Sequence, residues 1–223
     1  MCLTSWIALA TLLVSAVILL VGELLGSSDL HIITNHISEF AARPNLSGRL
    51  VNLSMWGFAL SYFTVAVHLL YTRTKPSLRV ALGCLGLSAA ASLLPFVAEY
   101  RLYYHQPEPP AQLSVWQRLG LVPRPIQPQK GAADVVREGV HGNVITASML
   151  WAAGALTLLG FGCFRRADAH FMLRHSWAVA LFSLLLFWMC NLPPAAWIKG
   201  LLELSAFSLI AGWLWLAVRH QTM

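Results

Sequence analysis

The sequence predicts an all-α, polytopic integral membrane protein, a bundle of six transmembrane helices. The chain of 223 residues is 57% hydrophobic and only 11% charged, which leaves no room for a separate soluble domain. Its charges also bracket six apolar stretches, each about as long as the roughly 20 helical residues that cross a hydrocarbon core of about 30 Å. Helices are expected because lipid offers no partners to backbone polar groups.

We expect the whole chain to form a single transmembrane domain, 1–223, and each span is justified by its flanks. The first span is uncharged up to Glu23, and we expect it to be retained because it lacks the positive start of a signal peptide. The later spans are bracketed by ionisable residues: Arg49–Arg73, Arg79–Glu99, His141–Arg165, Arg174–Lys199 and Lys199–Arg219. The predicted spans are 4–24, 50–72, 78–98, 142–164, 174–192 and 199–219, with long outer loops at 25–49 and 99–141.

The charges of the connections predict the orientation. Seven basic residues in the short connections and after the last span share one side, because the number of spans is even: Arg73, Lys75, Arg79, Arg165, Arg166, Arg174 and Arg219. The positive-inside rule places this side, and both termini, in the cytoplasm. Eight of the nine acids fall at or beyond the opposite ends of the helices, and only Asp168 lies inside. The basic rim suits anionic lipid headgroups, so membrane lipids are expected partners and nucleic acid is not.

Polar residues that carry chemistry gather at the outer side. The topology brings three segments and the helix ends into one layer: His31, His36, Glu39, Glu99, Glu138, His141 and Glu203. Glu203 is the most informative of them, because an acid one turn inside a span is costly unless it faces a polar cavity or a partner. The sequence therefore predicts an outer polar site.

Two interpretations of this layer stay open. As a reactive site, His31, His36 and His141 would be ligands of a divalent metal such as zinc or iron, with Glu39, Glu203 and Ser38 as catalytic residues. No other cofactor-binding residue is predicted. As structural elements, Ser38 and Glu39 would orient a helix start, and the five-residue spacing of His31 and His36 does not place them on one helix face.

Three short elements resemble a bacterial six-helix membrane family called domain of unknown function 998. They are His36-Ile37-Ser38-Glu39-Phe40 before the second span, Glu138-Gly139-Val140-His141 before the fourth, and Gly200-Leu201-Leu202-Glu203 in the last. The resemblance extends over essentially the whole chain in order and spacing. It implies the six-helix architecture, a bacterial inner membrane, and Ser38, Glu39, His141 and Glu203 as site residues. It implies no reaction.

Three functions are compatible with these features, and whether the chain is an enzyme is left open. The first is a membrane-embedded, lipid-directed hydrolase or transferase that uses the outer His/Glu layer. The second is a non-catalytic sensor or accessory subunit, with a membrane protein as partner. The third is a small transporter, which is the least favoured because no charge lies in the middle of the predicted spans.

Small residues and cysteines inside the spans are expected to serve packing. Stripes of small residues, Ser54, Gly57 and Ser61 in one span and Gly83, Gly86 and Ala90 in the next, would let helices approach closely in lipid. The four cysteines have no CxxC spacing, which argues against a disulfide framework or a thiolate metal site.

Overall fold

The computed structural model describes residues 3–25, 37–41, 45–73, 75–99, 132–164, 169–192 and 197–221. All regular elements within these ranges are helices, which confirms the all-α class. They are α1 (Leu3–Leu24), α2 (Ile37–Ala41), α3 (Leu46–Tyr71), α4 (Leu78–Glu99), α6 (Ala132–Cys163), α7 (Phe171–Arg174), α8 (Ser176–Met189) and α9 (Lys199–Gln221). Five of them, α1, α3, α4, α6 and α9, are long and apolar enough to cross a membrane, whereas α8 is apolar but has 14 residues.

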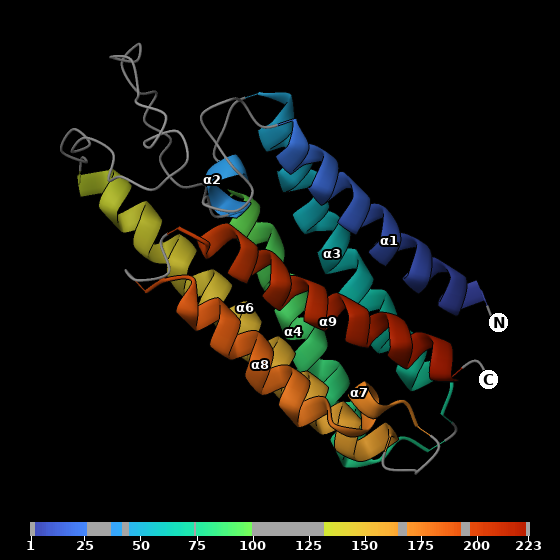
Figure 1. The fold of residues 1–223 in the computed structure, drawn as a ribbon. Coiled ribbons are helices and arrows are strands. Elements are labelled where there is room, and N and C mark those ends of the chain that lie inside the picture. The colour runs from blue at the N-terminus through green and yellow to red at the C-terminus, as the bar shows by residue number, and fades with distance from the viewer. Residues whose placement is uncertain are drawn as a thin grey trace.

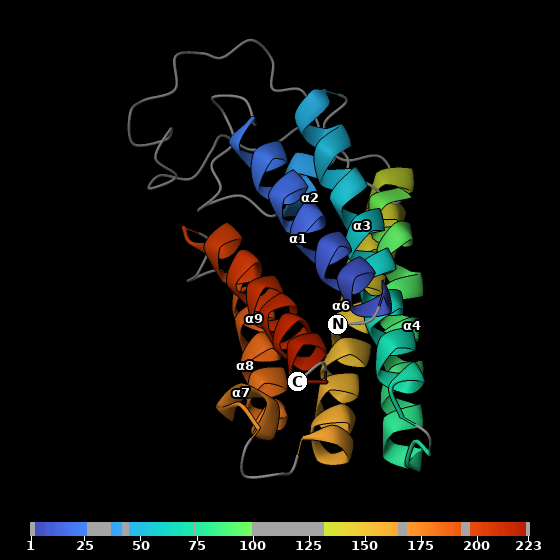
Figure 2. The ribbon, with the colours of Figure 1, turned by 90° about the vertical axis from the view of Figure 1, so that its right-hand side faces the viewer.

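The long helices follow one another around a ring (Figures 1 and 2). Each packs mainly against its neighbours in the order α1, α3, α4, α6, α8 and α9. The ring closes where α9 meets α1, and this contact is much less extensive than the others. We call the boundary between Leu3–Leu24 and Lys199–Gln221 the seam. In Figure 1 both chain ends lie at one end of the bundle, and α2 lies at the other.

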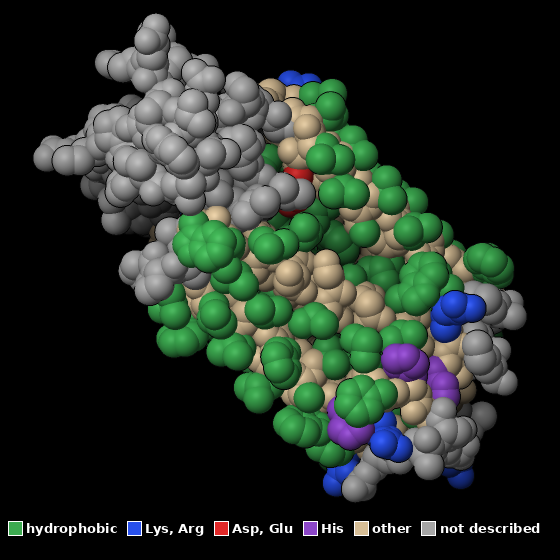
Figure 3. All heavy atoms as spheres, in the orientation of Figure 1, with side chains coloured by type: hydrophobic (Ala, Val, Ile, Leu, Met, Phe, Trp, Pro, Cys, Tyr) green, Lys and Arg blue, Asp and Glu red, His purple; other side chains and the backbone are tan. Residues whose placement is uncertain are grey.

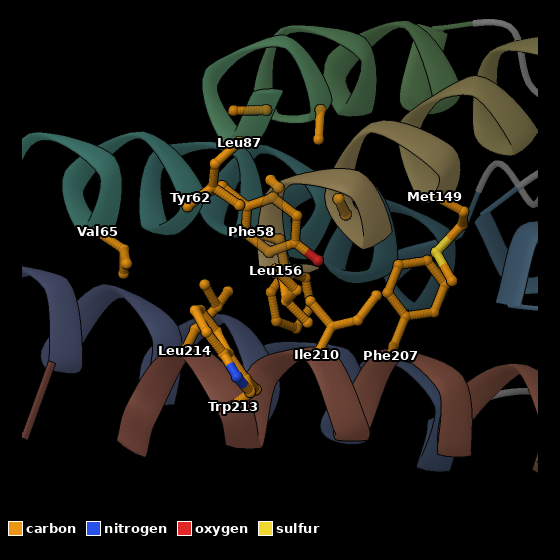
Figure 4. Close-up of a cluster of buried hydrophobic side chains, with 14 of the residues drawn as sticks. Phe58, Tyr62, Val65, Leu87, Met149, Leu156, Phe207, Ile210, Trp213 and Leu214 are labelled. Carbon is orange, nitrogen blue, oxygen red and sulfur yellow. The ribbon is translucent and has the colours of Figure 1, made fainter. Parts of the chain in front are cut away.

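The core is built from the inward faces of the ring helices (Figure 4). Side chains of α3, α4, α6 and α9 point toward one another there, and all of those labelled are buried: Phe58, Tyr62, Val65, Leu87, Met149, Leu156, Phe207, Ile210, Trp213 and Leu214. Trp213 is fully buried, its ring meets that of Phe164 edge-on at a centroid distance of 5.8 Å, and its Nε1 donates to Ser176 Oγ at 2.8 Å. These contacts join α9 to α8 on the inside of the ring.

Hydrogen bonds between helices supplement the apolar packing. Ser47 Oγ donates to the Gly22 carbonyl at 2.6 Å, and Thr4 Oγ1 lies 3.0 Å from His68 Nδ1, so α1 and α3 are joined near both ends. Ser148 Oγ donates to the Ala90 carbonyl at 3.1 Å between α6 and α4. Such bonds help the helices to associate, because in lipid the hydrophobic effect does not drive helices together.

Small residues lie where helices approach most closely, which confirms the predicted packing faces. A Cβ at Gly57 would lie 2.2 Å from Ser15 Oγ of α1, and one at Gly83 would lie 2.7 Å from Leu159 Cγ and 3.2 Å from the Leu159 backbone nitrogen of α6. A Cβ at Gly86 would touch the Ala155 methyl at 3.4 Å. Helices α3 and α4 therefore use glycine to reach their neighbours.

Replacing Gly83 with alanine is expected to destabilise the bundle, because a methyl group at this position has no room against the α6 backbone. Overpacking of this kind costs about 1–3 kcal/mol. Gly154→Ala is the matched control, since a Cβ there meets nothing within 4 Å. Thermal unfolding in detergent should show a lower midpoint for Gly83→Ala and an unchanged or higher one for Gly154→Ala. Equal midpoints would contradict the close approach of α4 and α6.

Helices continue beyond the predicted spans into the segments between them. Helix α6 begins at Ala132, ten residues before the predicted span start at 142. The first turns of α6 contain charged residues, so hydropathy does not detect them. The apolar part of the helix begins only at Gly139. The loop 25–49 contains α2 and the start of α3, where the Asn45 side chain accepts from the Gly48 N–H at 3.1 Å.

Candidate functional site

Three acids and one lysine meet at the α2 end of the seam. We call them the acid cluster: Glu23 of α1, Glu39 of α2, and Lys199 and Glu203 of α9. Their positions follow from the helices that carry them. Glu23 is the last residue but one of α1, and Lys199 and Glu203 are four residues apart at the start of α9, so they lie on one face of that helix. Helix α2 lies between α1, α3 and α9 and completes the cluster.

Glu203 is buried and binds the start of α2. Its side chain is 2% exposed, and its Oε2 accepts a hydrogen bond from the Ile37 backbone N–H at 2.8 Å. Ile37 is the first residue of α2, so its N–H has no carbonyl partner within the helix. The residue is also buried. A carboxylate is a strong acceptor for such a group. Glu203 therefore replaces the missing helical partner from a different helix.

Glu39 and Lys199 form a second contact between α2 and α9. The Lys199 Nζ and Glu39 Oε1 atoms make an ion pair, and the two side chains are 24% and 25% exposed. The pair lies at the edge of the buried region rather than inside it. Together with the bond from Ile37 to Glu203, it attaches α2 to α9 at two points.

Glu23 differs from the other two acids. Its side chain is 4% exposed, and within the described part of the chain its buried Oε2 atom has no hydrogen-bond partner. It interacts electrostatically with Glu203 across the seam. A buried carboxyl oxygen without a hydrogen bond is costly, so this position has an unused binding capacity.

The remaining predicted site residues are not brought into the acid cluster by the described contacts. His141 is buried on α6, which packs mainly against α4 and α8. His31 and His36 lie outside the described residues, as do the side chains of Ser38, Glu99 and Glu138. Among the described residues, no group of three or more His, Cys, Asp or Glu side chains is arranged to hold a metal ion. A divalent metal therefore stays a prediction that involves residues outside the described ranges.

Two members of the acid cluster were not among the predicted site residues. Glu23 looks like an ordinary acid at the membrane interface, since it directly ends an uncharged run. Lys199 looks like the boundary of a span. Two features of the sequence could have identified them. Lys199 and Glu203 are four residues apart, and Glu23 is expected at the same end of the bundle.

The surface supports a division of charge between the two ends of the bundle (Figure 3). On the face shown, acidic side-chain atoms are visible toward the α2 end of the bundle. Most of the visible Lys, Arg and His side chains gather at the opposite end, where α7 and both chain ends lie. Within the acid cluster, Glu39 has a quarter of its side chain exposed, whereas Glu23 and Glu203 are buried.

Comparisons with protein families, with curated proteins and with solved structures find no match to this chain. The chemistry of the acid cluster is therefore argued from its own atoms. Its carboxylates can accept hydrogen bonds, exchange protons or bind a cationic group. Glu39 and Glu203 already hold α2, whereas the Glu23 oxygen is available.

Proposed function

We propose that the chain is a six-span protein of the bacterial inner membrane, with both termini in the cytoplasm, and that it works as a membrane sensor. In this proposal the acid cluster receives the signal at the outer surface. Its state decides whether α2 stays docked on α9, and α9 carries the change to the cytoplasmic end. A membrane protein partner would read that change.

The sixth span of this proposal is α8. Its 14 residues rise about 21 Å, which is short of the roughly 30 Å hydrocarbon core. Helix α7 precedes it with only His175 between them, and a turn at Cys190–Leu192 follows it. These flanking segments extend the apolar element toward both headgroup regions. An even number of spans agrees with the two chain ends lying at the same end of the bundle in Figure 1, and the basic residues there suit a cytoplasmic location.

The observation that carries the sensor proposal is the double attachment of α2 to α9 through acids. Apolar packing also holds α2, because Ile37, Phe40 and Ala41 are buried in the core, but such packing offers no group that a ligand or a proton could replace. Carboxylates instead bind groups that a ligand or a proton can replace, and short elements held in this way can be released as a unit. The described acids that were predicted as catalytic, Glu39 and Glu203, are both engaged in holding α2.

Breaking the ion pair with Glu39→Gln is expected to loosen α2 and to be felt at the far end of α9. Hydrogen–deuterium exchange of the full chain in nanodiscs should be about two- to fivefold faster at 37–41, which corresponds to about 0.4–1 kcal/mol for a partly exposed pair. Exchange at 214–221 should also change. Arg49→Gln, an exposed substitution on α3, is the control. If exchange changes only at 37–41, the contact is a static attachment and the sensor proposal fails.

A lipid-directed hydrolase or transferase is the second candidate, and one observation favours it. Glu23 and Glu203 are two buried carboxyl groups that interact with each other. Such pairs perform acid–base chemistry when one group gives a proton and the other accepts one. Proteoliposomes containing the wild-type chain or Glu203→Gln would separate the candidates. A lipid product formed by the wild type alone, detected by mass spectrometry, would replace the sensor with the enzyme.

A further inference from the structure

The unpartnered Glu23 carboxyl is the strongest sign of an absent ligand. Its Oε2 atom is buried, and the described residues offer it no hydrogen bond. Glu203, on the opposite side of the seam, adds a second carboxyl group that interacts with it electrostatically. A ligand placed here would need an N–H or O–H donor to satisfy the buried Glu23 oxygen, and a positive charge on the ligand would strengthen that bond.

The charges within the acid cluster limit what this ligand is. Within the cluster, Lys199 is paired with Glu39. That pair shows the chemistry that the cluster accepts, a primary ammonium on a carboxylate. An ammonium group has three donors, enough to bridge two carboxyl groups, whereas a quaternary amine has none. A divalent metal would need more oxygen ligands than these two residues supply, and the described residues contain no such group of three.

We propose that Glu23 and Glu203 bind a primary ammonium group across the seam. This inference names the ligand of the proposed sensor and rests on that function for its site. The ammonium belongs either to the headgroup of an aminophospholipid or to a free amine. The exposed apolar side chains of Val21 and Leu24 on α1 and of Leu201 on α9 suit a headgroup whose acyl chains lie along these helices.

Binding at this site would act on α2 through Glu203. The same carboxyl group accepts the hydrogen bond from the Ile37 N–H. An ammonium that takes part of the negative charge of Glu203 weakens this bond, because a charge-assisted bond is stronger than a neutral one. The ligand would therefore loosen the start of α2 while the pair between Glu39 and Lys199 stays in place.

The test is a binding measurement on the purified full chain. Native mass spectrometry would compare phosphatidylethanolamine, phosphatidylcholine and phosphatidylglycerol with matched acyl chains, and thermal shift would compare ethanolamine with sodium chloride. We expect phosphatidylethanolamine to bind at least about tenfold more tightly than phosphatidylcholine, as the loss of charge-assisted donors predicts. Glu23→Gln should remove this preference, Glu23→Asp should keep part of it, and Arg49→Gln, an exposed substitution on α3, should leave it unchanged.

The outcomes separate the source of the ammonium and decide the proposal. A response to ethanolamine equal to that of the lipid identifies a soluble amine as the ligand, and a response to the lipid alone identifies the headgroup. Equal binding of the ethanolamine and choline lipids, a preference that survives Glu23→Gln, or an equal response to sodium would each overturn the ammonium site. Glu23→Asp guards against a misfolded variant, since it retains the carboxylate.

Failure of the sensor proposal would look different. Hydrogen exchange at 37–41, measured with and without phosphatidylethanolamine, reports whether binding reaches α2. A lipid preference that depends on Glu23 but leaves this exchange unchanged would support the ammonium site and contradict the sensor. Exchange that responds to Glu39→Gln at both 37–41 and 214–221, without any lipid preference, would support the sensor and contradict the ammonium site.

Discussion

Glu203→Ala is expected to release α2 from the bundle. The substitution removes the acceptor of the Ile37 N–H and leaves that buried donor without its partner from α9. An unsatisfied buried donor costs about 1–3 kcal/mol, which would speed amide exchange at 37–41 by roughly five- to more than a hundredfold. Hydrogen–deuterium exchange of the full chain in nanodiscs measures this directly.

Glu203→Gln separates the hydrogen bond from the charge. The glutamine side chain still offers a carbonyl oxygen to the Ile37 N–H, but without negative charge the bond is weaker. We expect exchange at 37–41 to lie between that of the wild type and that of Glu203→Ala. Unchanged exchange in the alanine variant would mean that α2 is held by packing alone. A glutamine variant as fast as the alanine variant would show that the charge, rather than the hydrogen bond, holds α2.

Trp213→Ala is expected to be the most destabilising single change in the core. The side chain is fully buried where α9 meets α8, and it contacts Phe164 as well as Ser176. Removing a buried aromatic ring of this size costs about 3–5 kcal/mol, because its neighbours close the cavity only in part. Thermal unfolding in detergent should show a large fall in the midpoint, with the helical content at low temperature retained.

Trp213→Phe is the matched control. Phenylalanine keeps a ring in contact with Phe164 but lacks the N–H that Ser176 accepts. The Ser176 hydroxyl keeps its own acceptor, the Leu173 carbonyl, so the expected loss is only about 0.5–1.5 kcal/mol. A phenylalanine variant as unstable as the alanine variant would assign the stability to the hydrogen bond instead of to the packing of the ring.

The long helices could be predicted from the sequence because their lengths follow from the bilayer. The first span was expected at 4–24 and α1 covers Leu3–Leu24; the last was expected at 199–219 and α9 covers Lys199–Gln221. Hydropathy fails where a helix continues past its apolar part, as at the start of α6, or where it is as short as α2. At α2 a tertiary contact, the bond from the Ile37 N–H to Glu203, takes the place of transfer into lipid in determining where the helix begins.

The partners within the site could not be predicted in the same way. The pattern of acids placed Glu39 and Glu203 at one level, and the structure joins both to α2 and α9. Which atom each acid binds depends on the rotation of α9 and on the place of α2 between α1, α3 and α9. These are properties of packing over the whole bundle, and the four-residue spacing of Lys199 and Glu203 indicates a shared helix face without giving the partner of either residue.

The closing contact of the ring has a consequence for how the chain is made. Neighbouring helices in the sequence are neighbours in the bundle, so each newly synthesised helix finds its partner already in the membrane. The seam is the exception, because it joins the first helix to the last. Until α9 leaves the ribosome, Ile37 and Glu39 lack the groups that hold α2, and Glu23 lacks its neighbour across the seam. The acid cluster is therefore assembled only in a finished chain, and a truncated product would expose these polar groups to quality-control proteases.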